Sequence, residues 1–283
     1  MKQLIQRAYR VFRNEGAIET INQSVRFLTG KLHYTFGING LFHSERYRSF
    51  IFWWNSGRGK YSAPADPFKI CWVDPHEISY ITNRDPFPGD FKWQHIGKVQ
   101  GGDWDQSTDR VADLLVYLGI KERYEKNVPW VKTEFFKHVQ QQVERGKADW
   151  KNSRTLADIK QGCDQVDRLI VKINGEGYKT MKDIIESENI NLKDSKLSEE
   201  LLKYDEIAVD IGRDGEFLFV DGRHRLSIAR ILDIDKVPVR IVARHQKWQT
   251  VRDQVATIDE IESLPKSTQR HLGHPDLEEF TSN

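Results

Sequence analysis

The stretch "DEIAVDIGRDGEFLFVDGRHRLSIARIL", residues 205–232, decides the expected fold. Two strand-like runs within it are separated by Arg213-Asp214-Gly215, and Asp-Gly between such runs is a strong signal for a β-hairpin. The second run stops at Asp221-Gly222, and the apolar pattern that follows predicts a helix from about Arg225 to Leu232. A further strand is expected over 237–243, which gives the order strand, strand, helix, strand.

Three basic or ionisable residues, Arg223, His224 and Arg225, follow the hairpin directly. At the start of a helix they oppose the positive end of the macrodipole, which costs stability unless an anion lies among them. Gly222, Arg223, His224 and Arg225 are therefore interpreted as a phosphate-binding loop, and Asp221 as a ligand for the Mg²⁺ that accompanies nucleotide phosphates. The alternative is that the arginines are solvated and that His224 packs beneath the helix.

A second candidate feature is the segment Gly101-Gly102-Asp103-Trp104-Asp105. Glycines allow a close approach of the backbone, and two carboxylates beside an aromatic ring suit a cation, a sugar or a substrate hydroxyl. Asp103, Asp105 and His224 are thus the candidate catalytic residues, with Asp103 or Asp105 accepting the hydroxyl proton. The alternative is a tight turn whose Trp104 fills the core.

The pattern Gly222-x-His224-Arg225 with Ala229, set between a hairpin and a following strand, resembles the signature of the ParB/sulfiredoxin-like superfamily. The resemblance covers roughly 68–105 and 160–245. It implies an α+β fold with a mixed sheet and a nucleotide diphosphate or triphosphate whose phosphates lie on the loop.

Within that superfamily, Asp221-Gly222-Arg223-His224-Arg225 is most similar to the loop of the free-serine kinases. Sulfiredoxins carry a cysteine at the position of Arg223, which argues against reductase chemistry here. Chromosome-partitioning members carry an arginine at the position of Ser227.

The expected organisation has three parts. Residues 1–60 form a basic helical extension, and residues 61–250 form the ParB/sulfiredoxin-like domain with a helical insertion at 107–160. The apolar spacing of this insertion indicates packing rather than chemistry. Residues 251–283 form a polar C-terminal tail, in which the spacing of His271, His274 and Asp276 does not favour a metal site.

The net charge of +1 hides an uneven distribution. Residues 1–60 carry ten Lys or Arg against three Glu, a net of +7, whereas the remainder carries 33 basic against 39 acidic residues, a net of −6. The extension therefore fits an anionic membrane surface, or it packs on the body as an ordinary helical pair. The acidic remainder makes nucleic acid a less favoured partner.

No apolar run approaches the roughly 18 residues that a membrane span requires. The N-terminus lacks the pattern of a secretory signal, and Cys71 and Cys163 are too few for a disulfide framework. The expected location is the cytoplasm or, through residues 1–60, the inner face of the membrane.

The leading hypothesis is a nucleotide-dependent and Mg²⁺-dependent phosphotransferase acting on a small or saccharide hydroxyl. It requires the fold to bring Asp103 or Asp105 to the basic loop at Arg223 to Arg225. A DNA-binding or nuclease-like protein is one alternative. A non-catalytic scaffold at a membrane surface is the other.

Overall fold

The computed structural model of the protein describes residues 53, 55, 59–64, 66, 68–84, 96–147, 150–188 and 203–281. The basic extension expected over residues 1–60 lies almost entirely outside the described residues. Its expected helices and its expected role at a membrane therefore stay predictions.

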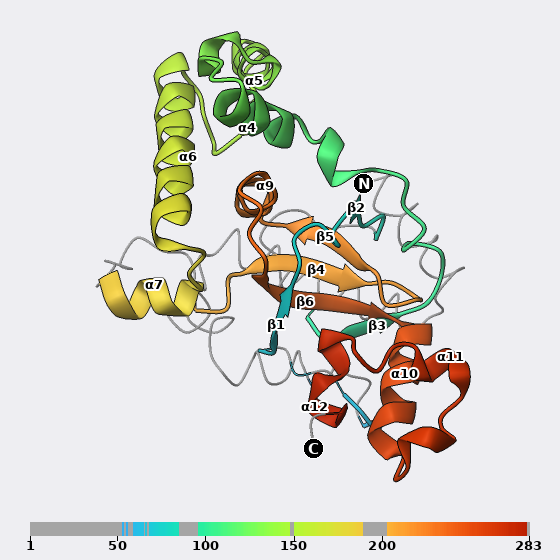
Figure 1. Ribbon diagram of the computed structural model, residues 1–283. Helices are drawn as coiled ribbons and strands as arrows, with labels where there is room; N and C mark the ends of the chain where they lie inside the picture. The colour runs from blue at the N-terminus through green and yellow to red at the C-terminus, as the bar shows by residue number, and fades with distance from the viewer. Residues whose placement is uncertain are drawn as a thin grey trace, which may run out of the picture.

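The described part of the chain contains one mixed sheet of six strands, in the order β1-β6-β4-β5-β2, with β3 paired to β6 (Figure 1). β1 pairs with β6, and β4 with β5, in antiparallel orientation, whereas the pairs β4–β6, β2–β5 and β3–β6 are parallel. The strands are β1 Ile70–Val73, β2 Tyr80–Ile81, β3 Lys98–Gln100, β4 Ile207–Ile211, β5 Phe217–Asp221 and β6 Val237–His245. The expected α+β class with a mixed sheet is confirmed.

The helices gather at two ends of this sheet (Figure 1). One group packs beyond α9 and consists of α4 Leu115–Glu125, α5 Glu134–Glu144 and α6 Leu156–Glu176, together with the short 3-10 turns η2 Val111–Asp113 and η3 Trp130–Lys132; α7 Met181–Glu188 follows α6. The other group follows β6 and consists of α10 Gln246–Thr257, η5 Ile261–Ser263, α11 Lys266–Gln269, η6 Pro275–Leu277 and α12 Glu278–Thr281. Helix α9 Arg223–Ile231 lies between the first group and the sheet.

The hairpin expected at Arg213-Asp214-Gly215 is confirmed, since β4 and β5 pair antiparallel on either side of it. Gly215 has φ +90°, a left-handed conformation that side chains rarely adopt. A Cβ atom at this position would lie 2.7 Å from the ring of Trp248 in α10. The glycine thus permits both the turn and the close packing of α10 against it.

Helix α9 joins two hydrophobic cores. Leu226 and Ala229 face the core of the sheet, while Ile228 belongs to the core formed by α4, α5 and α6. Ser227, which is fully buried between them, donates its hydroxyl to the carbonyl of Arg223 at 2.6 Å, a common way for a helix to satisfy a buried serine. Because α9 is covered on both sides, its first residues are held firmly with respect to the helical group.

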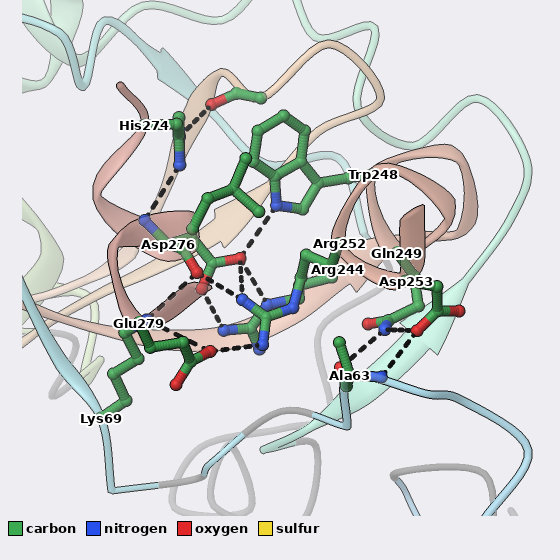
Figure 2. A network of polar contacts seen from close by, with 12 residues as sticks. Ala63, Lys69, Arg244, Trp248, Gln249, Arg252, Asp253, His274, Asp276 and Glu279 are labelled. Atoms are coloured by element: carbon green, nitrogen blue, oxygen red, sulfur yellow. Dashed lines mark hydrogen bonds and ion pairs between the residues drawn. The ribbon is translucent and has the colours of Figure 1, made fainter. Parts of the chain in front are cut away.

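The segment expected as a polar tail is integrated into the core of the sheet. Helix α10 runs across the expected boundary at residue 250, and Val255, Leu264 and Leu277 are buried with the strands. Asp276 is fully buried and accepts hydrogen bonds from Arg244 and Trp248, and it pairs with Arg252 at 3.0 Å (Figure 2). The segment is therefore packed onto the sheet and held by a charge network at Asp276, while other polar residues of it, such as Asp259, are exposed.

Among the described residues, no helix is long and apolar enough to cross a bilayer.

Candidate functional site

The start of α9 carries the three ionisable residues on which the sequence analysis centred. Gly222 is the N-cap, with φ +95° and ψ +27°, and no side chain caps this helix end. Arg223, His224 and Arg225 occupy the first turn, two residues earlier than the helix expected from Arg225. The amides of this first turn have no partner within the helix, so they present partial positive charge.

Arg223 is exposed and lines a cavity of about 320 Å³ between α9 and the helical group. Its other walls come from the start of α4 and from one face of α5. The lining residues are Asp113, Leu114, Leu115, Val116, Phe135, His138, Val139, Gln142, Val143, Lys147, Trp150 and Arg223. The cavity is thus mostly apolar along α4 and α5, where His138 and Gln142 also line it. It carries positive charge at Arg223 and Lys147 and one carboxylate at Asp113.

Lys147, Lys151 and Arg223 surround Trp150, and we call them the cationic cluster. Lys147 and Arg223 line the cavity with Trp150, and Lys151 Nζ lies 5.7 Å from the centre of the Trp150 ring. Within the described part of the chain, none of the three forms an ion pair with a carboxylate; Lys151 donates instead to the neutral Gln165. Such uncompensated positive charge beside a cavity attracts an anion.

The side chain of His224 is hydrogen-bonded to Trp150. Trp150 Nε1 donates to His224 Nε2 at 2.9 Å, and because an indole can only donate, this imidazole nitrogen is the acceptor. Burial, together with the charges of Lys151 and Arg223, lowers the pKa of His224 to about 4. At neutral pH His224 is therefore uncharged, and its hydrogen bond fastens α9 to Trp150, in line with the packing alternative. Its catalytic and phosphate-binding roles stay predictions.

Arg225 is directed toward the sheet. Its guanidinium lies 3.3 Å from a carboxylate oxygen of Glu206, which is itself buried and accepts from the amide of Met181 at 2.5 Å. Burial raises the pKa of Glu206 to about 7, against the opposing effects of the Met181 amide and Arg225. Arg225 is thus partly neutralised, and Arg223 is the residue of the loop that is available to an external anion.

Asp103 and Asp105 lie at the opposite end of the hairpin from the basic loop. Both bond to Arg213 in the turn between β4 and β5, Asp103 at 2.8 Å and Asp105 at 2.7 Å. Asp221, at the start of the loop, pairs instead with Ala208 at the other end of β4. Five residues of strand separate the two ends, which is roughly 15 Å at the usual rise per residue.

The structure therefore does not bring the two predicted halves of the active site together. Burial favours a raised pKa for Asp105, but hydrogen bonds from the side chain and amide of Arg213 outweigh it and lower the pKa. Trp104 is buried beside it, as the alternative of a core-filling turn predicted. Asp105 is a structural anchor for the hairpin turn.

The predicted metal ligand, Asp221, is half-buried directly before Gly222. Among the residues that the structure describes, no group of three or more His, Cys, Asp or Glu side chains is placed to hold a metal ion. Mg²⁺ bound with nucleotides often takes only one or two protein carboxylates, the phosphates and water supplying the rest. Asp221 fits such a shared role, and Mg²⁺ stays a prediction.

The residues that sequence reasoning missed come from the insertion at 107–160. Lys147, Lys151, Trp150 and His138 were expected to serve packing, yet all but Lys151 line the cavity, and Lys151 lies beside its Trp150 wall. A signal was present in the sequence, since Lys147, Lys151 and Arg154 cluster around a single tryptophan. It could not be connected to Arg223, because the chain separates Trp150 from His224 by 74 residues.

No protein-family model, no curated protein and no solved structure matches this chain. The resemblance to the ParB/sulfiredoxin-like superfamily accordingly rests on the loop residues from Asp221 to Arg225 and on Ala229.

Proposed function

We propose that the protein binds a small phosphorylated ligand of the nucleotide class in the cavity between α4, α5 and the start of α9. The observation that carries the proposal is the cationic cluster, whose three charges have no carboxylate partner among the described residues. Lys147 and Arg223 line the cavity itself, and Arg223 lies at the uncapped start of α9.

The chemistry of each part suits a phosphate. An arginine guanidinium can donate two parallel hydrogen bonds to phosphate oxygens, and a lysine adds a mobile positive charge. The free amides of the first turn of α9 add donors that no side chain of the cap occupies. Arg223 and Lys147 are therefore the proposed phosphate ligands, with Gly222 shaping the turn that presents them.

Phosphoryl transfer to a small or saccharide hydroxyl is a second proposal, and one observation favours a revised form of it. Asp113 lines the cavity together with Arg223, whereas Asp103 and Asp105 bond to Arg213 at the far end of the hairpin. In this form Asp113 takes the proton from the acceptor hydroxyl. The oxygen of that hydroxyl bonds to the transferred phosphorus, and the nucleoside diphosphate leaves. The Asp113→Asn variant should bind nucleotide but show no nucleotide consumption with a panel of hydroxyl acceptors.

Binding of DNA and docking on a membrane both depend on the basic residues 1–60. These residues lie almost wholly outside the described ranges, so DNA binding and membrane docking both stay predictions.

Isothermal titration calorimetry with AMP, ADP, ATP and CTP, each with and without Mg²⁺, tests the binding proposal. Arg223→Ala should weaken binding by about tenfold or more, because a charge-assisted hydrogen bond to phosphate is lost. Arg168→Ala is the matched control, since it removes an exposed arginine from α6 that does not line the cavity. Absence of binding by the unaltered protein, or equal loss in both variants, would contradict the proposal.

A further inference from the structure

We propose, on the basis of the proposed function, that the ligand of this cavity is an amphipathic phosphomonoester whose organic part packs on α4 and α5 and donates a hydrogen bond to Gln142. The phosphate alone would use only the cationic end of the site. The remaining walls define the rest of the ligand.

Apolar side chains form much of the cavity wall. Leu114 and Val116 at the start of α4, and Phe135, Val139 and Val143 on α5, line the cavity side by side. Inorganic phosphate would leave these surfaces in contact with water, whereas an aromatic or aliphatic group would bury them. An organic ester should therefore bind more tightly than the free ion.

The cavity is small. A volume of about 320 Å³ lies at the lower end of the range for small-molecule sites, which is roughly 300 to 1,000 Å³. The walls are contributed by three helices packed on one another, so the space is bounded on several sides. A compact monoester fits this space better than an extended polyphosphate chain.

The side-chain oxygen of Gln142 is buried and has no hydrogen-bond partner among the described residues. A buried acceptor without a donor is costly, and Gln142 lines the cavity. A turn of the Gln142 side chain toward the cavity would let an N–H or O–H group on the organic part of the ligand satisfy this oxygen. The backbone carbonyl of the same residue accepts from the amide of Lys147 at 2.9 Å, so the acceptor and the cation are held on one short piece of chain.

Three ligands separate these elements when they are titrated calorimetrically into the full-length protein. Inorganic phosphate has only the anion, phenyl phosphate adds an apolar ring, and AMP adds a ring with N–H donors. We expect affinity to rise in that order, by about tenfold for the ring and about fivefold for the donor, as buried apolar area and one hydrogen bond would give.

Two variants test which side chain of the cavity wall gives each increase in affinity. Val143→Phe narrows the apolar part and should abolish the advantage of phenyl phosphate over inorganic phosphate. Gln142→Leu removes the acceptor and should abolish the additional advantage of AMP over phenyl phosphate. Leu115→Trp, at the exposed rim of the same wall, repeats the first test should Val143→Phe fail to fold, and Arg168→Ala controls for unspecific effects.

The outcomes distinguish this inference from the proposed function. Equal affinity for the three ligands, or affinity ratios that the wall variants leave unchanged, would overturn the inference while Arg223-dependent phosphate binding would still support the proposed function. Binding of none of the ligands, or binding that Arg223→Ala does not weaken, would overturn the proposed function itself.

Discussion

Each buried carboxylate of the described residues contacts at least one arginine. These carboxylates are Asp105, Glu206, Asp210 and Asp276. The four carboxylates differ in how closely, and by how many groups, they are bonded. Burial alone would raise the pKa of Asp276, but the charges of Arg244 and Arg252 and a bond from Trp248 hold it well below its usual range. Glu206 lies 3.3 Å from the guanidinium of Arg225, and there burial prevails and raises the pKa of Glu206 to about 7.

Glu206 therefore predicts a pH dependence of stability. Its pKa is about 7 in the folded protein and about 4.3 in an unfolded chain. Because the folded state holds the proton more tightly, the stability gained from it is complete below about pH 4 and is lost as the pH rises through about 7. Glu206→Gln cannot ionise, so its unfolding free energy relative to the unaltered protein should rise by on the order of 2–3 kcal/mol from pH 5 to pH 8.

Urea unfolding followed by circular dichroism at the two pH values measures this difference. Glu125→Gln, at an exposed position near the end of α4, should show the same relative stability at both. A pH-independent difference for Glu206→Gln would show that Glu206 does not titrate in this range.

At the scale of single elements, the junction of β5 and α9 governs where the candidate site points. Gly222 adopts a left-handed conformation, and a Cβ atom on it would lie 3.1 Å from the backbone Cα of Ile207. Ile207 belongs to β4, the strand that pairs with β5, so its backbone has little freedom to move. The glycine allows α9 to start directly at the end of β5, which places Arg223 at the cavity.

Gly222→Ala should lower the unfolding free energy by about 1–2 kcal/mol, the cost of a left-handed backbone for a residue with a Cβ atom. It should also weaken anion binding, because the first turn of α9 must shift away from Ile207. Gly175→Ala is the control: it lies near the end of α6 with open space around it, and the change should stabilise by up to about 1 kcal/mol. Thermal unfolding and calorimetry measure both effects, and equal stability of the two variants would disprove this role for Gly222.

At the scale of the whole molecule, charged residues connect the C-terminal segment to the sheet. Asp276 in η6 receives bonds from Arg244 of β6 and from Trp248 and Arg252 of α10 (Figure 2). His274 extends the network, since one ring nitrogen bonds to the carbonyl of Gly215 at 2.9 Å and the ring stacks on Phe217. The segment thus closes over the turn of the hairpin.

Asp276→Asn should destabilise the whole protein by about 3–5 kcal/mol, because two buried guanidinium groups lose their shared charge partner. Asp259→Asn, an exposed position in the same segment, should change the unfolding free energy little. Urea unfolding gives both values. A change of less than about 1 kcal/mol for Asp276→Asn would show that the network does not fasten this segment.

The sequence by itself determined the hairpin, the helix after it, the returning strand and hence the α+β class. These features depend on local signals, namely the Asp-Gly turn, the period of apolar residues and the glycine at the helix start, which act over a few neighbouring residues. Helix α6 follows the same kind of local signal, since its buried Val166, Ile170 and Ile173 recur at helical spacing and it ends before Gly177.

Only the tertiary structure decided the partners of the charged residues. Asp105 meets Arg213 across 108 residues of chain, and Trp150 meets His224 across 74, so no local pattern could show that one pair anchors a turn and the other fixes a helix. The polar C-terminal segment was misleading for the same reason, because its Asp276 is paired inside the protein with Arg244 of β6 and Arg252 of α10. The presence of a charged residue in the sequence does not show which way its side chain points. The electrostatic energy that orients the side chain depends on partners that folding brings near.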